Sequence, residues 1–305
     1  MTTHGRSRST ESEIRHAPVL VAEVVSMLSP ESDGLYVDCT VGLGGHTAAL
    51  LAAGAGKVLG LDRDEHALAI AGERLKEWES RIELVHADYR DLGRVAQERS
   101  ISGVSGVLVD FGVSSMQLDD ASRGFSFRNS GPLDMRMDQS RGESLASRLE
   151  SVDDETLADV IYRFGEERRS RRVARAILAA RDRGELRNTA ELASAARRGA
   201  GGGEWQRIDP ATRTFQALRI WVNAELDGLD EFIATAVGLL RPGGRMAVIA
   251  FHSLEDRIVK HAVRRLRDAG VVTAVTRRPV QPGDEEMAAN PRARSAKLRV
   301  VEKVA

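Results

Sequence analysis

A glycine-rich segment near the start of the chain has the residues expected of a nucleoside-binding turn. It reads DCTVGLGGH over residues 38–46 and follows a short apolar run. Glycines after a strand let the backbone approach a ligand closely, and a following helix offers free N–H groups and a positive dipole end. Asp62 lies about 20 residues beyond Gly42, the spacing of a carboxylate that binds ribose hydroxyls. This pattern predicts a site for a cofactor that contains a nucleoside.

The third glycine position separates two classes of cofactor. A dinucleotide fingerprint requires Gly-x-Gly-x-x-Gly or Ala, but counted from Gly42 the third position is Thr47. The segment opens instead as Asp38-x-Thr40-x-Gly42, which suits a methyl donor whose amino-acid ammonium can meet a carboxylate. We therefore expect S-adenosylmethionine, with a nicotinamide-dependent dehydrogenase as the alternative.

Further acidic residues follow the other predicted strands of this region. After residues 81–86, Asp88 and Tyr89 combine a carboxylate, which could accept from the amine of adenine, with a ring that could stack on it. Asp110 closes the next apolar run. A turn that uses glycine for packing alone, and a helix-start role for His46, are the structural alternatives.

Apolar strands and amphipathic helices alternate around these residues. The predicted strands cover residues 35–39, 57–61, 81–86, 107–109 and 246–251. Helices are predicted at 46–53, 65–78 and 254–268, and a final hairpin pairs 271–276 with 297–302. Strands that alternate with helices predict a parallel sheet with helices on both faces.

The alternation is interrupted in the middle of the chain by a region that reads as helical. One helix is predicted over 151–183, with an apolar face formed by Leu157, Val160, Ile161, Val173, Ile177 and Leu178. Another begins after Asn188, and a flexible break at 200–203 precedes a long helix over 214–240, which Arg241-Pro242-Gly243-Gly244 should end. We expect a loose tail at 1–15, an α/β domain from 16–114 and 213–305, and a helical insertion at 115–212.

Basic residues gather in two regions although the net charge of the chain is only −1. Residues 160–220 hold 14 Lys and Arg against 7 Asp and Glu, and residues 257–305 hold 12 against 5. Two basic regions on an acidic body indicate a surface for a polyanion. Solvated helical faces would give the same counts.

Composition also limits the cellular compartments in which the protein is expected. No apolar run approaches the roughly 20 residues that span a bilayer, and the polar start of the chain lacks the apolar region of a secretory signal. Cys39 is the only cysteine, which excludes an internal disulfide and a cysteine metal cluster. We expect a cytoplasmic protein with no membrane partner and no metal.

Seven motifs in order resemble the bacterial ribosomal small-subunit methyltransferase H family, also called MraW. The resemblance extends from His16 to the end of the chain. The motifs are VDCTVGLGGHT, LDRD from Leu61, DFGVSSMQLDDASRGFSF from Asp110, GPLDMRMD from Gly131, PATRTFQALRIWVNAEL from Pro210, FHSLEDRIVK from Phe251 and NPRARSAKLR from Asn290. Some relatives have a longer segment where this chain has the compact loop 279–287.

The resemblance implies an α/β fold, a Rossmann-like class I methyltransferase sheet with an inserted all-helical domain that recognises RNA. It implies transfer of a methyl group from S-adenosylmethionine to the N4 amine of a specific cytidine in the decoding region of 16S rRNA, within the small ribosomal subunit. Matched by motif position, the donor contacts fall on Gly44, Gly45, His46, Asp62, Tyr89, Asp110 and Gln117. Many relatives have Phe in place of Tyr89, so the ring is kept.

The reaction requires a group that holds the target amine against the donor. Asp110 is the catalytic residue we expect, because a carboxylate can accept the amine hydrogens. His252, Ser253 and Asp256 are further candidates for holding the base, and a helix cap is the alternative for His252 and Ser253. Other amino-group methyltransferases carry an Asn/Asp-Pro-Pro-aromatic motif after this strand. Its prolines are missing here, which disfavours a DNA amino-methyltransferase.

Several residues of the basic regions could contact RNA. Phe125, Phe127 and Arg128 could stack on a splayed base, or the two rings could anchor a loop. The Arg-rich helices of the insertion and residues 290–299 are candidates for phosphate contacts. A non-enzymatic RNA-binding module is the remaining alternative, and the intact glycine turn argues against it. The sequence leaves open whether the protein is a monomer or a homodimer, and whether it acts on naked rRNA or on the assembled subunit.

Overall fold

The computed structural model describes residues 18–201 and 209–305. The tail expected at 1–15, and the part of the expected break at 200–203 that follows Gly201, lie outside the described residues. Within the described ranges, no helix combines the length and the apolar character needed to cross a bilayer.

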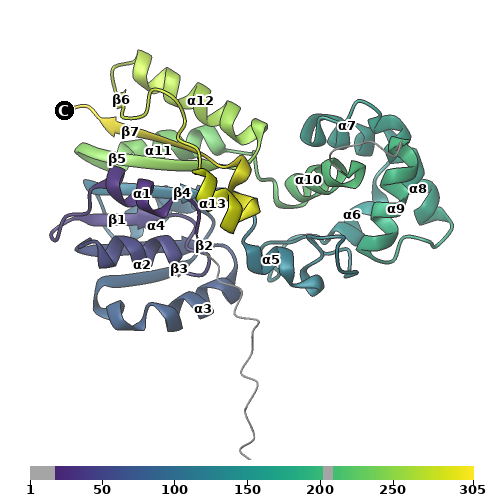
Figure 1. The fold of residues 1–305 in the computed structure, drawn as a ribbon, viewed down its shortest axis with the longest axis horizontal. Coiled ribbons are helices and arrows are strands. Elements are labelled where there is room, and N and C mark those ends of the chain that lie inside the picture. Colours follow the sequence, from purple (N-terminus) through teal and green to yellow (C-terminus); the bar gives the residue numbers. More distant parts are fainter. Residues whose placement is uncertain (1–17, 202–208) are drawn as a thin grey trace, which may run out of the picture.

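A seven-stranded sheet forms the larger part of the molecule (Figure 1). Its strand order is β3-β2-β1-β4-β5-β7-β6. The strands are β1 (Leu35–Asp38), β2 (Lys57–Asp62), β3 (Ile82–His86), β4 (Val104–Asp110), β5 (Leu240–Ala250), β6 (Val272–Ala274) and β7 (Lys297–Lys303). The first five are parallel, and β7 lies antiparallel between β5 and β6. The predicted Rossmann-like sheet and its final hairpin are confirmed.

Successive residues of the strands face opposite sides of the sheet, as the two-residue period of a strand requires. Tyr36, Val58 and Leu108 pack with α1 (Val21–Leu28), α2 (Gly45–Ala52) and α3 (Glu65–Arg74). Val37, Leu59 and Val107 pack on the other face with α4 (Leu92–Glu98), α11 (Leu229–Leu239) and α12 (Ser253–Asp268). Helices on both faces leave the carboxyl ends of the strands as the accessible edge, where open α/β sheets bind ligands.

The fifth strand begins earlier than the sequence indicates. Residues 241–244, predicted as a stop and turn, lie inside β5. Leu240 pairs with Val104, and the register then shifts so that Arg245 pairs with Gly106. The prolyl-glycyl segment is therefore a bulge in the strand and not the end of its pairing.

Five helices form a separate unit beside the sheet (Figure 1). They are α6 (Leu145–Ser151), α7 (Asp154–Gly165), α8 (Ser170–Asp182), α9 (Thr189–Ala200) and α10 (Pro210–Asn223). They share one hydrophobic core, which includes all six apolar residues predicted for the helical face. The short helix α5 (Ser115–Asp119) and an irregular segment connect this helical unit to β4.

Two predicted long helices are interrupted. The helix expected over 151–183 breaks at Glu166, and the helix expected over 214–240 breaks at Ala224; both residues are left-handed, with φ of 50° and 48°. A left-handed residue ends the ladder of backbone hydrogen bonds of a helix. Neither position is a glycine, so the residue types did not indicate that the helices end there.

Helix α10 packs within the helical unit. Phe215, Leu218 and Val222 contribute to its core, and α10 lies against α7 and α9. The domain boundary expected between residues 212 and 213 therefore falls inside this helix. The chain returns to the sheet through the turn at 224–228.

Candidate functional site

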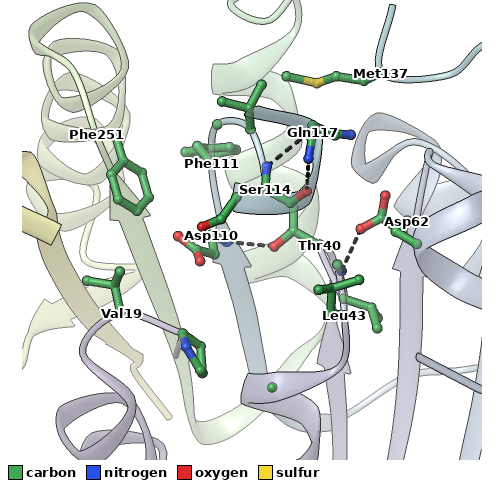
Figure 2. A pocket seen from close by; sticks show the side chains of 18 of the residues that line it. Val19, Thr40, Leu43, Asp62, Asp110, Phe111, Ser114, Gln117, Met137 and Phe251 are labelled. Atoms are coloured by element: carbon green, nitrogen blue, oxygen red, sulfur yellow. Dashed lines mark hydrogen bonds between the residues drawn. The ribbon is translucent and has the colours of Figure 1, made fainter. Parts of the chain in front are cut away.

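A cavity of about 390 Å³ opens at the carboxyl ends of the parallel strands (Figure 2). Thr40 and Asp62 line it from the ends of β1 and β2, and Asp110 from the end of β4. Gln117 of α5 and Met137 of the connecting segment line it from the side of the helical unit. The cavity therefore lies where the predicted turn, the strand ends and the helical unit meet.

Asp62 is held by the glycine turn. Its Oδ2 accepts from the amide of Gly42 at 2.7 Å, and its Oδ1 accepts from the amide of Asp64 at 2.8 Å. Gly42 has a φ of 53°, in the left-handed region that glycine adopts without steric cost. Burial raises the pKa of Asp62 to about 6. Each carboxylate oxygen keeps a lone pair for a ribose hydroxyl.

Thr47, which occupies the third-glycine position, anchors helix α2 to strand β1. Its Oγ1 donates to Oδ2 of Asp38 at 2.7 Å, and the amide of Thr40 donates to Oδ1 at 3.1 Å. Both Asp38 and Thr47 are fully buried. Asp38 therefore acts beneath the turn and does not line the cavity. The hydroxyl of Thr47 therefore anchors the helix at the position where a dinucleotide fold has a closely packed glycine.

The two adjacent glycines of the turn have different surroundings. Gly45 lines the cavity, and a Cβ there would lie 2.7 Å from Cγ of Pro18. Gly44 is not among the lining residues; its φ is 83°, and a Cβ would lie 2.9 Å from Cδ1 of Leu75. The structure thus assigns Gly44 to packing against the residue that follows α3, and leaves Gly45 at the predicted site.

His46 and Asp110 approach each other across the cavity floor. Nε2 of His46 lies 2.9 Å from the carbonyl oxygen of Val19, and Nδ1 lies 3.9 Å from Oδ2 of Asp110. Burial lowers the pKa of His46 to about 4. The ring is therefore neutral near pH 7, with Nε2–H donating to the carbonyl and Nδ1 facing the carboxyl.

Asp110 has an oxygen without a partner. Its backbone amide donates to Oγ1 of Thr40 at 2.7 Å, but its Oδ1 has no hydrogen-bond partner among the described residues. Desolvation, then the charges of Asp38 and Glu255, raise the pKa of Asp110 well above its ordinary value. A cationic ligand beside this carboxyl would favour its charged form. Figure 2 shows the carboxyl directed into the space between Val19 and Phe251.

Gln117 and Tyr89 are both at the cavity wall. Gln117 forms a capping box with Ser114 and donates from Nε2 to Asp64 at 2.7 Å. Tyr89 donates to the carbonyl oxygen of Glu225 at 3.0 Å, and its ring packs edge-on with that of Phe111, 5.4 Å away. Both predicted donor contacts therefore line the cavity in fixed orientations.

Asp88 is not available for the adenine contact suggested by the sequence. Its carboxylate is bound by Arg63 at 3.0 Å and by Arg90 at 2.8 Å, and it does not line the cavity. Burial alone would raise the pKa of Asp88, but the hydrogen bond from Arg90 and the charge of Arg63 leave it lowered. The structure does not support the adenine contact, because two arginines, one from the LDRD motif and one that follows Tyr89, already bind this carboxylate.

The three candidates for holding the base do not line the cavity. Ser253 donates to Glu166 at 3.0 Å, and Asp256 is paired with Lys297 at 3.2 Å and with Arg299 at 2.7 Å. His252 is the N-cap of α12, which confirms the alternative role for that residue. Ser253 and Asp256 therefore stabilise the position of α12 and have no direct access to a bound base.

Phe125 and Phe127 also have the structural role that was the alternative to stacking on a base. Phe125 is buried in the core of the helical unit, and the Phe127 ring packs against that of Phe215 at 4.9 Å. The guanidinium of Arg197 lies 5.3 Å from the centre of the Phe127 ring. The two rings anchor the loop, and of the three residues only Arg128 is exposed.

Several charged residues that the sequence did not single out line the cavity. Among them are Arg219, Glu225 and Glu255. Arg219 holds Glu225 through two hydrogen bonds of 2.9 and 2.8 Å. The four-residue spacing of a capping box, His252-x-x-Glu255, was a signal for the role of Glu255 in the cap of α12. No spacing rule would find Glu225, because the break at Ala224 directs it back to the cavity.

The whole chain matches one protein family. The family described as the MraW methylase family matches residues 13–304. The ribosomal RNA small subunit methyltransferase H of Sorangium cellulosum is 53% identical over 95% of this chain and 91% of that protein. The protein of the same name from Geobacter sp. is 44% identical over 96% of this chain and 99% of that protein.

Solved structures show a more distant likeness. An rRNA methylase from Streptococcus thermophilus is 14% identical, with a TM-score of 0.43, over 93% of this chain and 96% of that chain. The sequence match shows the family, and the strand-end carboxylates and glycine turn of the cavity suit a nucleoside with a cationic tail. The chain belongs to the MraW methylase family, and its methyl donor is S-adenosylmethionine.

Proposed function

We propose that the protein transfers a methyl group from S-adenosylmethionine to the N4 amine of a specific cytidine in the decoding region of 16S rRNA, in the cytoplasm. The observation that carries the choice of an amine is the Asp110 carboxyl, which lines the cavity and has an oxygen, Oδ1, without a hydrogen-bond partner among the described residues. An amine offers hydrogens to such an oxygen, whereas a carbon acceptor does not. The names of the curated relatives support rRNA of the small subunit as the substrate.

The donor occupies the half of the cavity beside the glycine turn. Asp62 accepts from the ribose hydroxyls, and Gly45 lets the backbone approach the amino-acid tail. Tyr89 and Gln117 flank the base of the nucleoside, and Asp110 lies nearest the reacting end. The bound donor supplies a methyl carbon activated by its sulfonium, so the protein must mainly align the amine with that carbon.

The helical unit supplies the surface for RNA. Arg168, Arg171, Arg172 and Arg175 are exposed around the first turns of α8 and form no salt bridge with the described residues. Positive charges at the start of a helix interact unfavourably with the helix dipole. Phosphate groups of RNA would offset this interaction by pairing with the four arginines.

The other basic segment is a weaker candidate for RNA contacts. Arg292 pairs with Asp119, and Lys297 and Arg299 pair with Asp256. These pairs hold residues 291–295 against α5 and β7 against α12. We therefore assign the phosphate contacts mainly to α8 and keep only Arg294, which is exposed, from the segment 290–299.

The proposal is tested by methyl transfer from labelled donor to small ribosomal subunits that lack the modification. Mass spectrometry of nuclease fragments should find one N4-methylcytidine in the decoding region. Isolated 16S rRNA, treated in parallel, distinguishes the naked from the assembled substrate. Incorporation at another atom, or none with either substrate, would reject the proposed function.

A further inference from the structure

The cavity contains a carboxylate that the donor contacts do not use. Glu255 lies in the first turn of α12 and is only 2% exposed, yet it lines the cavity. Phe251, which precedes the helix, lines the same cavity and faces Asp110 (Figure 2). Glu255 therefore borders the space that a planar base would enter on its way to the methyl group.

The backbone fixes the orientation of this carboxylate. Oε2 accepts from the amide of Phe251 at 2.9 Å and from the amide of His252 at 3.3 Å. The amide of Glu255 in turn donates to Nδ1 of His252 at 3.3 Å. Both Oε2 contacts are to donors of the chain, which leaves Oε1 as the oxygen free to bind a ligand.

The ring of His252 lies beside that oxygen. Because Nδ1 accepts an amide hydrogen, the neutral ring carries its proton on Nε2, which lies 3.1 Å from Oε1. Nε2 has no aligned hydrogen bond with any described residue. The ring thus stabilises the charge on Oε1 electrostatically and keeps the side chain in place, while Oε1 accepts no aligned hydrogen bond from it.

We propose that Glu255 is a catalytic residue of the methyl transfer, whose Oε1 accepts a hydrogen of the target amine and takes the proton that its nitrogen loses. His252 is the positioning residue for this carboxylate. The inference rests on the proposed function, since it requires an exocyclic amine as the acceptor. It adds to Asp110 a second carboxylate that lines the same cavity.

The atoms and electrons of the step balance as follows. The lone pair of N4 forms a bond to the methyl carbon while the carbon–sulfur bond breaks and its electron pair goes to sulfur. The positively charged N4 then gives one hydrogen, as a proton, to Oε1, and the resulting carboxylic acid returns it to water. An alkylated exocyclic nitrogen is a strong acid, so a carboxylate is a sufficient base.

The two cavity carboxyls have opposite pKa shifts, which suits different roles. Burial alone would raise the pKa of Glu255, but His252 and the Arg219 guanidinium leave it lowered. The pKa of Asp110 is raised, chiefly by desolvation. Two carboxyls whose environments separate their pKa values are a familiar arrangement of acid and base in enzymes. Glu255 is the one that stays ionised and able to accept a proton.

A divalent cation is the competing occupant of this cluster. Glu225, His252 and Glu255 each offer an atom within 4.8 Å of the others. However, Arg219 binds both carboxylate oxygens of Glu225, and the Nε2 that faces the cluster carries a proton. A cation would have to displace the guanidinium and reverse the tautomer, so the contacts favour an amine as the ligand.

The test compares two substitutions of Glu255 that separate catalysis from capping. Glu255→Gln keeps the length and one oxygen for the backbone amides but loses the charge, whereas Glu255→Asp keeps the charge on a shorter stem. If Glu255 is the base, Gln should lower kcat by about 100-fold or more, and Asp should remain at least tenfold faster than Gln. A purely structural role predicts the reverse order, because Gln is the better replacement in the cap.

Donor binding and a control variant complete the design. The Kd for S-adenosylhomocysteine, measured by calorimetry, should stay within about threefold of the wild type in Glu255→Gln. Glu166→Gln removes another carboxylate that contacts α12, through Ser253 and Arg257, but outside the cavity, and should methylate at the wild-type rate. Wild-type kcat in Glu255→Gln would overturn the inference, as would activity that is lost on chelation and restored by Mn²⁺ or Zn²⁺.

Product mapping separates this inference from the proposed function. The modified atom is identified with the wild-type protein, and the rates are measured with the variants on the same subunits. N4-methylcytidine made at full rate by Glu255→Gln removes the role of Glu255 and leaves the proposed function intact. No N4-methylcytidine from the wild type removes both.

Discussion

The Nδ1 atom of His46 lies 3.9 Å from Oδ2 of Asp110, where the start of α2 meets the end of β4. Burial lowers the pKa of His46 to about 4, and desolvation raises that of Asp110. Both shifts disfavour charge, so the pair is neutral over a range above pH 4 in the free protein. A cationic donor would change that balance at Asp110.

Donor binding should therefore release protons. The free protein holds a proton on Asp110 up to its raised pKa, and the nearby positive charge of the bound donor lowers that pKa. Affinity for S-adenosylmethionine should rise with pH between the two values and level off above the higher one. Calorimetry in buffers of different ionisation enthalpy measures the release. Asp110→Asn should abolish it, and an unchanged release in that variant would contradict the assignment.

Asp62→Asn should weaken donor binding by about 10- to 100-fold, which corresponds to the loss of one charged hydrogen-bond acceptor. The amide of Asn cannot accept from Gly42 and Asp64 at once as Asp62 does, and its NH₂ group would face one of these donors. Equilibrium dialysis with labelled donor gives the affinity. Asp230→Asn, an exposed carboxylate paired with Arg265, serves as the control and should bind normally.

Gly44→Ala should destabilise the protein by about 1–3 kcal/mol, because the new Cβ meets Leu75 and the φ of 83° is strained for alanine. Leu75→Ala removes the clash but not the strain. A double-mutant cycle by urea unfolding should show that Gly44→Ala costs less in the Leu75→Ala background. Equal costs in both backgrounds would mean that Leu75 does not limit this position.

Asp38→Asn should gain stability relative to the wild type as the pH rises. Burial raises the pKa of Asp38 to about 6, from 3.8 unfolded, so the folded wild type holds its proton more tightly. Its stability then falls between about pH 4 and 6, by roughly 3 kcal/mol in total. The difference in unfolding free energy between variant and wild type, measured at pH 4 and pH 7, should shift by this amount toward Asp38→Asn. A difference that does not change with pH would mean that the pKa is not raised.

Charge reversal on α8 should weaken RNA binding more at low salt than at high salt. Arg171→Glu with Arg175→Glu removes two exposed cations, and the slope of log affinity against log salt should fall by about 1 for each lost contact. Filter binding to small subunits at several salt concentrations gives the slope. Arg94→Glu on α4, in the sheet unit, is the matched control. A slope equal to that of the wild type would place the RNA elsewhere.

The sheet was predictable because its signals are local. Strand β4 contains the apolar run 107–109, and β1, β2 and β4 each end on an aspartate at the same edge of the sheet. Asp62 and Asp110 were found in this way. The spacing from Gly42 to Asp62 also follows from geometry, since α2 and then β2 connect the turn to Asp62.

The remaining parts depend on contacts that spacing does not encode. Successive residues of a helix point about 100° apart, so the motif around α12 could not say that Glu255 faces the cavity while Asp256 faces β7. The breaks at Glu166 and Ala224 arise from non-glycine residues in left-handed conformation, which tertiary packing imposes. The pairing of Asp88 with Arg63 could not be predicted, because only the folded loop brings the two side chains together.

The position of β7 bears on how the chain folds during synthesis. Because this strand lies between β5 and β6, the outer edge of β5 stays unpaired until residue 303 has left the ribosome. All five parallel strands can associate before that, but they present an open apolar edge. A chain cut before Lys297 would keep that edge unpaired and would associate with other copies through it. Strand β7 therefore covers the edge of β5 only at a late stage of synthesis.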